Sequence, residues 1–323
     1  MENESEVSEL YPKLNSPNYY SVYPPVSQIL FVFGNLLSMR LIFALCEIGA
    51  LVLLAKMLCP RALIFYAWNP LVILETWGQT HTESAMLLCL VAMLFFMHMR
   101  LFWASSAALA VAIWVKLWPV LLVPFLLRHQ GWRIRDIGAI LLVSVLVWIP
   151  FADVETANAL KSLQLYMNTF EFNAGLYYVA KSIVSIFVYG LEWIPDQDVR
   201  PIIGVASKIV LILGLVLIYL RGSSWRIESQ ILAVVMLSLL TLPTIHPWYL
   251  LPVFLLIPMF PQLQWSWIWL GACSLGTYLL YTHGQAWYWS YVALGWTGWL
   301  IFIIRDYRRW KSTRGLKTAG LSL

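Results

Sequence analysis

The stretch "PIIGVASKIVLILGLVLIYL", residues 201–220, decides the fold of this protein. It contains one charged side chain, Lys208, and its other residues are almost all apolar or small. About twenty consecutive apolar residues are what an α-helix needs to span the hydrocarbon core of a bilayer. The stretch therefore predicts a helix that crosses a membrane.

Runs of the same kind recur along the whole chain. They cover approximately residues 26–38, 41–58, 62–76, 84–99, 101–127, 137–151, 201–220, 229–243, 247–260, 265–281 and 286–304. Of the 323 residues, 61% are hydrophobic and 11% are charged. An average soluble domain carries about a quarter charged residues. The sequence therefore predicts an all-α, polytopic transmembrane helical bundle with about eight to eleven membrane segments, some of them short or broken.

The apolar runs divide the chain into three parts. Residues 1–25 form a polar segment, residues 26–304 form the membrane domain, and residues 305–323 form a basic tail. Residues 152–200 interrupt the membrane domain, which predicts an external loop. The net charge of +5 comes largely from the tail, and we expect membrane lipids with anionic headgroups as its partner, and no nucleic acid.

The arginines and lysines predict the orientation of the chain. They gather in three segments, at residues 128–135, at residues 221–226 and in the tail. Segments rich in Lys and Arg stay in the cytoplasm, so all three should lie there. Counting the apolar runs between them places residues 152–200 and His246 on the opposite face.

The face of the membrane on which His81 lies depends on one further element. It falls on the same face as His246 if residues 101–127 form a broken hairpin or a re-entrant pair. Pro119 and Pro124 lie in this run, and proline kinks or breaks a helix. The sequence therefore predicts a break near these prolines.

Polar side chains cluster at the end of one apolar run, in "WNPLVILETWGQTHTES", residues 68–84. Ionisable groups in or near lipid are costly and mark functional sites by default. A carboxylate beside a histidine suits abstraction of a proton from a sugar hydroxyl. Glu83 and His81 are therefore the catalytic candidates, with Glu75 and Gln79 as substrate-binding candidates. The alternatives are a capped helix end at Glu75 and a polar link between helices at His81 and Glu83.

Further candidates lie within and after later runs. Lys116 lies in an apolar run, where an unpaired lysine is costly, and His246 and Tyr249 follow in "HPWYLLPVFLL". A lysine or histidine can hold a phosphate, and aromatic rings can stack on a sugar or surround a prenyl chain. The alternative for His246, which precedes Pro247, is a simple boundary between two helices.

The external loop carries the last candidate, Asn173, in "EFNAGLYY". Gly175 follows it, and glycine permits a turn because it tolerates conformations that other residues avoid. We expect this loop to act as a lid in which Asn173 hydrogen-bonds sugar hydroxyls. The alternative is a segment that merely covers helix ends.

Five segments of the sequence together resemble a known family. In the same order, they are similar to motifs of the GT-C superfamily of integral membrane glycosyltransferases, in particular its polyprenyl-phosphate-sugar-dependent, mannosyltransferase-like members. The segments are "VYPPVSQILF", "WNPLVILETWGQTHTES", "KLWPVLLVPFLL", "FNAGLYYVAK" and "HPWYLLPVFLL". Each motif is short and tolerant, but five in order are a stronger signal than one.

The resemblance implies transfer of a sugar, with mannose as a candidate, from a polyprenyl-phosphate donor to an acceptor glycan or glycolipid. The reaction would take place on the non-cytoplasmic face, in a bacterial inner membrane rather than the endoplasmic reticulum. A carboxylate deprotonates the acceptor hydroxyl, which attacks the anomeric carbon with inversion. Cations such as Lys116 and protonated His246 hold the charge of the leaving phosphate. A lipid monophosphate demands no metal, and no acidic pair has metal-ligand spacing, so we expect no cofactor.

The sequence departs from the family pattern in two places. In "THTE", His81 and Glu83 take the positions of the family's histidine and aspartate, while Thr80 and Thr82 replace its glycine and asparagine. Members also begin with a membrane helix and an external loop with an early aspartate, and residues 1–25 contain no aspartate. One alternative is therefore a truncated, non-catalytic membrane subunit. The other is a transporter or flippase for a lipid-linked sugar.

Overall fold

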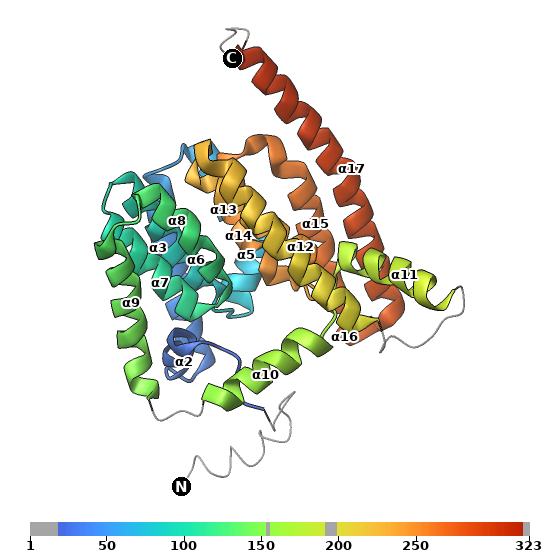
Figure 1. Ribbon diagram of the computed structural model, residues 1–323, viewed down its shortest axis with the longest axis horizontal. Coiled ribbons are helices and arrows are strands. Elements are labelled where there is room, and N and C mark those ends of the chain that lie inside the picture. Colours follow the sequence, from blue (N-terminus) through green and yellow to red (C-terminus); the bar gives the residue numbers. More distant parts are fainter. Residues whose placement is uncertain (1–18, 153–155, 191–198, 319–323) are drawn as a thin grey trace.

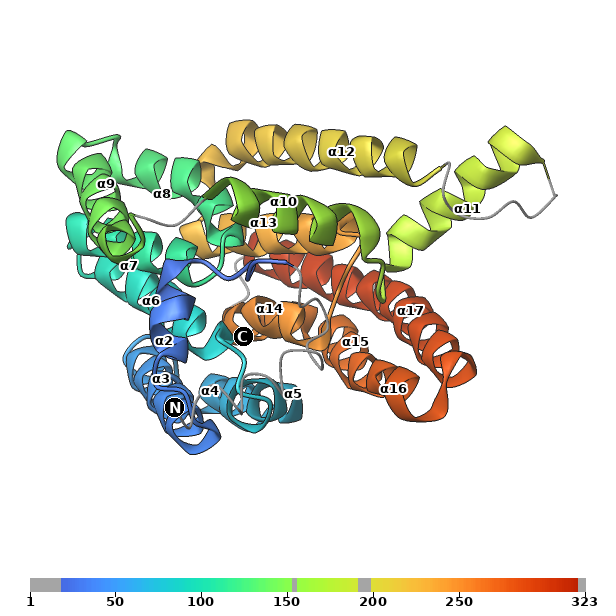
Figure 2. The same ribbon diagram turned by 90° about the horizontal axis from the view of Figure 1, so that it is seen from below.

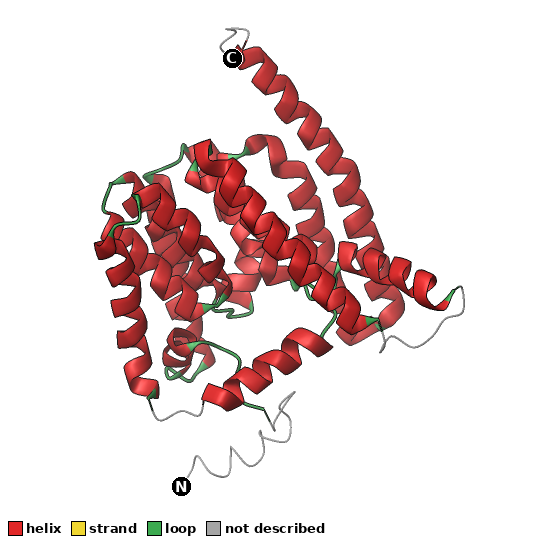
Figure 3. Ribbon diagram, viewed as in Figure 1, coloured by secondary structure: helices red, strands yellow, loops and turns green. Residues whose placement is uncertain are grey.

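The computed structural model describes residues 19–152, 156–190 and 199–318. Most of these residues are helical, and within these ranges β-structure is limited to an isolated bridge between Phe172 and Thr244 (Figure 3). The predicted all-α class is therefore confirmed. Residues 1–18 of the polar segment 1–25 and residues 319–323 of the tail lie outside the described residues.

The first half of the chain forms a group of helices on one side of the molecule, the left side of Figure 1, with α3, α6, α7, α8 and α9 close together. The elements are α2 (Pro25–Phe31), α3 (Leu36–Ala55), α4 (Pro60–Ala67), α5 (Pro70–Ile73), the π-helix η2 (Leu74–Gly78), α6 (Glu83–His98), α7 (Phe102–Val115), η3 (Trp118–Leu122), α8 (Val123–Gln130) and α9 (Ile134–Trp148). Proline is the first residue of several of the short helices. It is tolerated there because an N–H in the first turn, which proline lacks, would have no partner within the helix.

The second half continues with helices of very different length. The elements are η4 (Ile149–Phe151), α10 (Thr156–Thr169), α11 (Gly175–Tyr189), α12 (Arg200–Arg221), η5 (Gly222–Ser224), α13 (Ile227–Thr241), η6 (Pro247–Leu250), α14 (Leu251–Leu256), η7 (Ile257–Met259), η8 (Pro261–Leu263), α15 (Gln264–Gly276), η9 (Thr277–Leu279), α16 (Leu280–His283) and α17 (Gln285–Thr318). Seen from below, α12 lies along one edge of the molecule and α3, α4 and α5 lie along the opposite edge (Figure 2).

Among the described residues, three helices are long and apolar enough to cross a membrane: Leu36–Ala55, Ile134–Phe151 and Arg200–Ser224. A fourth crossing is added if the pair Pro70–Gly78 and Glu83–His98, which is bent by 117°, counts as one broken span. Four more apolar helices have between 10 and 17 residues. These helices support an α-helical membrane protein. They are fewer than the eight to eleven predicted segments, because prolines and short 3-10 turns divide several apolar runs.

Arginines mark one end of the helices. At this end Arg128 donates to the carbonyl oxygen of Tyr219 and, over 2.7 Å, to Gln230 Oε1. His98 Nε2 lies 3.2 Å from Glu228 Oε1. The ends of α6, α8 and α12 and the start of α13 therefore meet, and we call this region the basic end. In Figure 1 it lies at the top, where the far end of α17 also lies.

The run 101–127 is a broken hairpin, one of the two arrangements that place His81 on the same face as His246. The start of α7 lies at the basic end, since Gln130 at the end of α8 donates to the carbonyl oxygen of Phe102 over 3.1 Å. The chain leaves along α7, breaks at Lys116, which has an extended backbone (φ −151°, ψ 132°), and returns through η3 and α8. The starts of α6 and η3 and the ends of α7 and α13 thus lie away from the basic end, at what we call the polar end.

The stretch 152–200 contains the two helices α10 and α11, so it is more ordered than the word loop implies. Between these helices, Phe172 N donates to Pro243 O over 3.0 Å, and Ile245 N donates to Phe172 O over 2.7 Å. This bridge attaches the stretch to the segment before His246. Residues 305–318, expected as a separate tail, continue α17 without a break.

Candidate functional site

The bend between η2 and α6 places the first part of the site. Asn69 caps α5 by accepting from Leu71 N over 2.9 Å, and Pro70 fixes the first turn. The helix then widens into the π-turn η2, an element that is frequent at functional sites. Thr80, with φ +57°, reverses the chain before α6 begins at Glu83. The bend therefore brings Glu75, on η2, close to the loop that follows it.

Glu75 is fully buried, and its carboxylate has two partners. Tyr278 donates its hydroxyl proton to the two oxygens over 3.0 and 2.9 Å. His81 Nε2 lies 3.4 Å from Oε2. Because a buried carboxylate needs such partners, Glu75 holds His81 in place across the bend.

Glu83 and Lys116 form the second polar pair. Glu83 is the first residue of α6, and its carboxylate pairs with the ammonium of Lys116 at the break after α7. The side chain of Glu83 is 3% exposed and that of Lys116 is 22% exposed. The Lys116 ammonium also lies 4.6 Å from the ring centroid of Tyr249. The break in the hairpin thus carries a lysine into contact with both α6 and η6.

A stack of rings joins the two pairs. His81 lies against the indole of Trp248 with 4.0 Å between ring centroids, and His246 stacks on the same indole at 4.2 Å and 8°. Phe172, from the stretch between α10 and α11, stacks on His246 at 4.7 Å. Tyr249 meets His246 edge to face at 5.6 Å. Rings from three distant parts of the sequence therefore meet at the polar end.

The two histidines lie in loops outside the helices, and their surroundings favour the uncharged form of each ring. Burial, with a further contribution from the Lys116 ammonium, lowers the pKa of His81 to about 4. Burial, Lys116 and His81 together lower the pKa of His246 to about 4. The lowered pKa disfavours the protonated form in which His246 is expected to hold a phosphate. Each ring can instead accept a proton.

Gln79 lies apart from these contacts. It is exposed, and its side chain makes no hydrogen bond with any residue in the described part of the chain.

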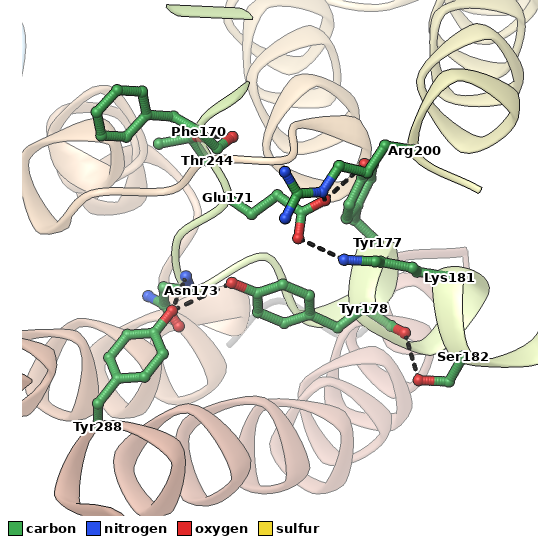
Figure 4. A network of polar contacts seen from close by, with 10 residues as sticks. All are labelled: Phe170, Glu171, Asn173, Tyr177, Tyr178, Lys181, Ser182, Arg200, Thr244 and Tyr288. Atoms are coloured by element: carbon green, nitrogen blue, oxygen red, sulfur yellow. Dashed lines mark hydrogen bonds and ion pairs between the residues drawn. The ribbon is translucent and has the colours of Figure 1, made fainter. Parts of the chain in front are cut away.

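Asn173 is buried next to α17, and its backbone and side chain are both engaged. Its N–H donates to the Tyr288 hydroxyl over 2.7 Å (Figure 4). Trp296 Nε1 donates to its carbonyl oxygen and to Oδ1 over 3.0 and 3.1 Å. Its amide nitrogen Nδ2 is buried without a hydrogen-bond partner in the described residues. That unpaired donor is the one group of Asn173 left for a ligand.

The glycine after Asn173 has a different role from the one that the sequence predicts. The left-handed backbone belongs to Asn173, with φ +50°, and not to Gly175. A Cβ on Gly175 would lie 2.0 Å from Cδ2 of Trp296. Gly175 is therefore required because the indole packs against the start of α11.

Three residues of the site were not expected from the sequence. Trp248 lies in the same motif as His246 and Tyr249, but the chain has 18 tryptophans and nothing in the sequence distinguishes this one. Tyr278 lies 203 residues from Glu75, and Phe172 reaches His246 through the bridge to Thr244. Only the fold brings these residues together.

The arrangement offers acid–base chemistry and a buried ammonium. The neutral His81 beside a carboxylate is a proton acceptor, and Lys116 can face an anion. No group of three or more His, Cys, Asp or Glu side chains in the described ranges is placed to hold a metal ion. No protein-family model matches this sequence, and no curated protein matches it either.

Proposed function

We propose that the protein transfers a sugar from a polyprenyl-phosphate donor to an acceptor glycan or glycolipid on the non-cytoplasmic face of the membrane, in the manner of a GT-C glycosyltransferase. One observation carries this proposal: the pairs Glu75–His81 and Glu83–Lys116 converge on the Trp248 stack at the polar end of the helices. The five ordered motifs add support from the sequence.

The proposed reaction uses His81 as the base. When Nε2 carries the ring proton and donates it toward Glu75, Nδ1 is free to accept a proton from the acceptor hydroxyl. The hydroxyl oxygen forms a bond to the anomeric carbon from the face opposite the donor phosphate. The bond between that carbon and the phosphate oxygen breaks, the electron pair stays on the oxygen, and the configuration inverts.

Lys116 is proposed to bind the leaving polyprenyl phosphate. An ammonium favours the charge that develops on the phosphate oxygen as the bond breaks. Because the Glu83 carboxylate pairs with this ammonium, Glu83 is assigned to positioning Lys116. Tyr249, whose ring faces the same ammonium, is assigned to the wall of the donor site.

The test is a transfer assay on membranes that contain the protein and a radiolabelled polyprenyl-phosphate sugar. His81→Asn and Lys116→Gln should each lower the rate by about 100-fold or more, the range expected for loss of a proton-transfer or charge-stabilising group. Arg221→Gln at the basic end is the control and should leave transfer within about twofold of wild type. Absence of transfer by the wild type would exclude the proposed activity. A His81→Asn variant as active as the control would exclude His81 as the base.

The same membranes test the transporter alternative, which a different observation favours. Discontinuous helices are typical of transporters, and the pair α5–η2 and α6 is bent by 117°. In reconstituted vesicles, movement of the labelled lipid across the bilayer without sugar transfer identifies a transporter. If neither occurs, a non-catalytic membrane subunit is the remaining interpretation.

A further inference from the structure

A cavity of about 500 Å³ lies beside the start of α12, on the other side of the Phe172–Thr244 bridge from the histidines. Its walls come from the segment at Phe170 and Glu171, from α11, from α12 and from the end of α13. The volume is in the range of ordinary small-molecule sites. No residue of the proposed transfer site lines it, so it is a separate feature of the fold.

One face of α12 forms the longest wall. Arg200, Gly204, Ser207, Lys208 and Leu211 all line the cavity. Residues three or four apart share a helix face, and this spacing keeps all five on one stripe. The first and fourth are cations that lie about 12 Å apart along the helix axis, at 1.5 Å per residue.

The space between these cations is open. A Cβ on Gly204 would meet no atom within 4 Å, and Ser207 is also small. Two positive side chains therefore flank a gap that no side chain of α12 fills.

Among the described residues at the cavity, Glu171 and Lys208 differ in their partners. Glu171 accepts from Lys181 over 2.7 Å, faces Arg200 Nε at 3.4 Å and accepts from the Tyr177 hydroxyl over 3.1 Å (Figure 4). Lys208 makes no hydrogen bond or ion pair within the described residues, although it lies inside an apolar span. A lysine in such a position marks a functional site by default.

We propose that this cavity binds the phosphate of an anionic lipid, with Lys208 as the principal donor and Arg200 contributing positive charge. The phosphate lies over Gly204 and Ser207, where α12 leaves room. The lipid chain follows α12 toward the membrane centre, where Leu211 is part of the cavity wall and Ile212 and Val216 are exposed. This direction suits a lipid, because its polar headgroup then stays near Arg200, at the start of the α12 span.

The charged cavity excludes a purely apolar occupant. Lys208 is exposed on an apolar span, where an ammonium without a counter-ion is unfavourable in lipid, and a phosphate oxygen supplies one through a charge-assisted hydrogen bond. The long lysine side chain can lie along the helix and still reach the phosphate level. The inference is independent of sugar transfer and holds for a membrane phospholipid as well as for a polyprenyl phosphate.

Native mass spectrometry of the delipidated, purified protein in detergent tests the proposal. Phosphatidylglycerol, polyprenyl phosphate and phosphatidylcholine are titrated separately, and millimolar inorganic phosphate is added as a competitor. The wild type should bind one molecule of either anionic lipid more tightly than phosphatidylcholine. Lys208→Gln and Gly204→Leu should each raise the dissociation constant about tenfold or more, by loss of the cation and by filling the gap.

Matched variants separate binding from folding. Lys208→Arg keeps the charge and should keep most of the affinity, while Arg221→Gln removes a charge from the other end of the same helix and should leave binding unchanged. Circular dichroism and gel filtration check that each variant is folded. The anionic lipid that binds with the lower dissociation constant identifies the natural source of the phosphate. Equal affinity of Lys208→Gln and wild type, equal binding of phosphatidylcholine, or displacement of the lipid by inorganic phosphate would each overturn the proposal.

Discussion

At the scale of residues, the polar end is organised in pairs rather than as free charges. Glu83 is almost completely buried and has the Lys116 ammonium as its partner, while Glu75 has Tyr278 and His81. Removal of one member of a buried ion pair leaves an uncompensated charge, which is more destabilising than removal of both. Glu83 and Lys116 therefore contribute to stability as a unit.

This coupling predicts a result for a double-mutant cycle. Lys116→Met should lower the free energy of unfolding by about 3–5 kcal/mol, because it leaves the Glu83 carboxylate unpaired. The added Glu83→Gln change removes that carboxylate and should restore most of the loss. Thermal unfolding followed by tryptophan fluorescence in detergent measures both. A double variant no more stable than Lys116→Met would show that the two side chains are not coupled.

Residues that break an apolar pattern could be found from the sequence, whereas their surroundings could not. Glu75, His81, Glu83 and Lys116 stand out because ionisable groups are rare in such runs, and the fold brings all four together. The charge of His246 could not be predicted, since its pKa depends on burial by residues distant in the sequence.

At the scale of elements, the helices that carry the site pack on one another through α15. The segment α5 leads into η2 and Glu75, and α14 follows η6 and Trp248. Gly271 of α15 lies against both, since a Cβ there would be 2.6 Å from Phe254 Cζ on α14 and 3.5 Å from Leu71 Cδ2 on α5. Close packing at this glycine holds the two parts of the site at a fixed separation.

Two glycines inside helices give a matched test of this packing. Gly271→Ala should lower the free energy of unfolding by about 1–3 kcal/mol, because Phe254 is buried and has little room to move. Gly138→Ala in α9 adds the same methyl group where nothing lies within 4 Å. It should be neutral or stabilising by up to about 1 kcal/mol, since alanine favours a helix. Thermal unfolding of both variants measures the difference, and equal effects would contradict the packing argument.

Elements were predicted well where the sequence contains a clear break and less well elsewhere. Prolines in the run 101–127 predicted a break, and the chain breaks at Lys116, shortly before Pro119. The stretch 152–200 is polar enough to resemble a loop, yet it forms α10 and α11. Hydropathy reports which residues avoid water, but it does not report where a helix of the required length begins and ends.

At the scale of the whole molecule, the fold separates two chemistries. The arginines of α8 and of the connection from α12 to α13 meet at the basic end, and the buried Glu75 and Glu83 lie with His81 and His246 at the polar end. The cavity beside α12 opens near Arg200, the end of that helix opposite Arg221. Both proposed sites therefore lie away from the basic end, so a lipid bound in the cavity and a substrate at the histidines would occupy the same half of the molecule.

This geometry predicts the orientation of the protein in its membrane. Arginine-rich connections remain in the cytoplasm, so the basic end should face the cytoplasm and the polar end should face outward. The test uses a background without the four native cysteines and two exposed positions, Gln79 at the polar end and Trp132 at the basic end. A membrane-impermeant maleimide should label Gln79→Cys in intact cells and Trp132→Cys only after permeabilisation.

Each other outcome of the labelling has a definite meaning. The reverse pattern would place the histidines on the cytoplasmic side and contradict a transfer reaction on the outer face. Labelling of both positions from the same side would show that the two ends do not lie on opposite faces of the bilayer. The predicted pattern would place His81, Lys116 and the start of α12 where a lipid-linked sugar and its phosphate approach from the outer leaflet, which is what both proposals require.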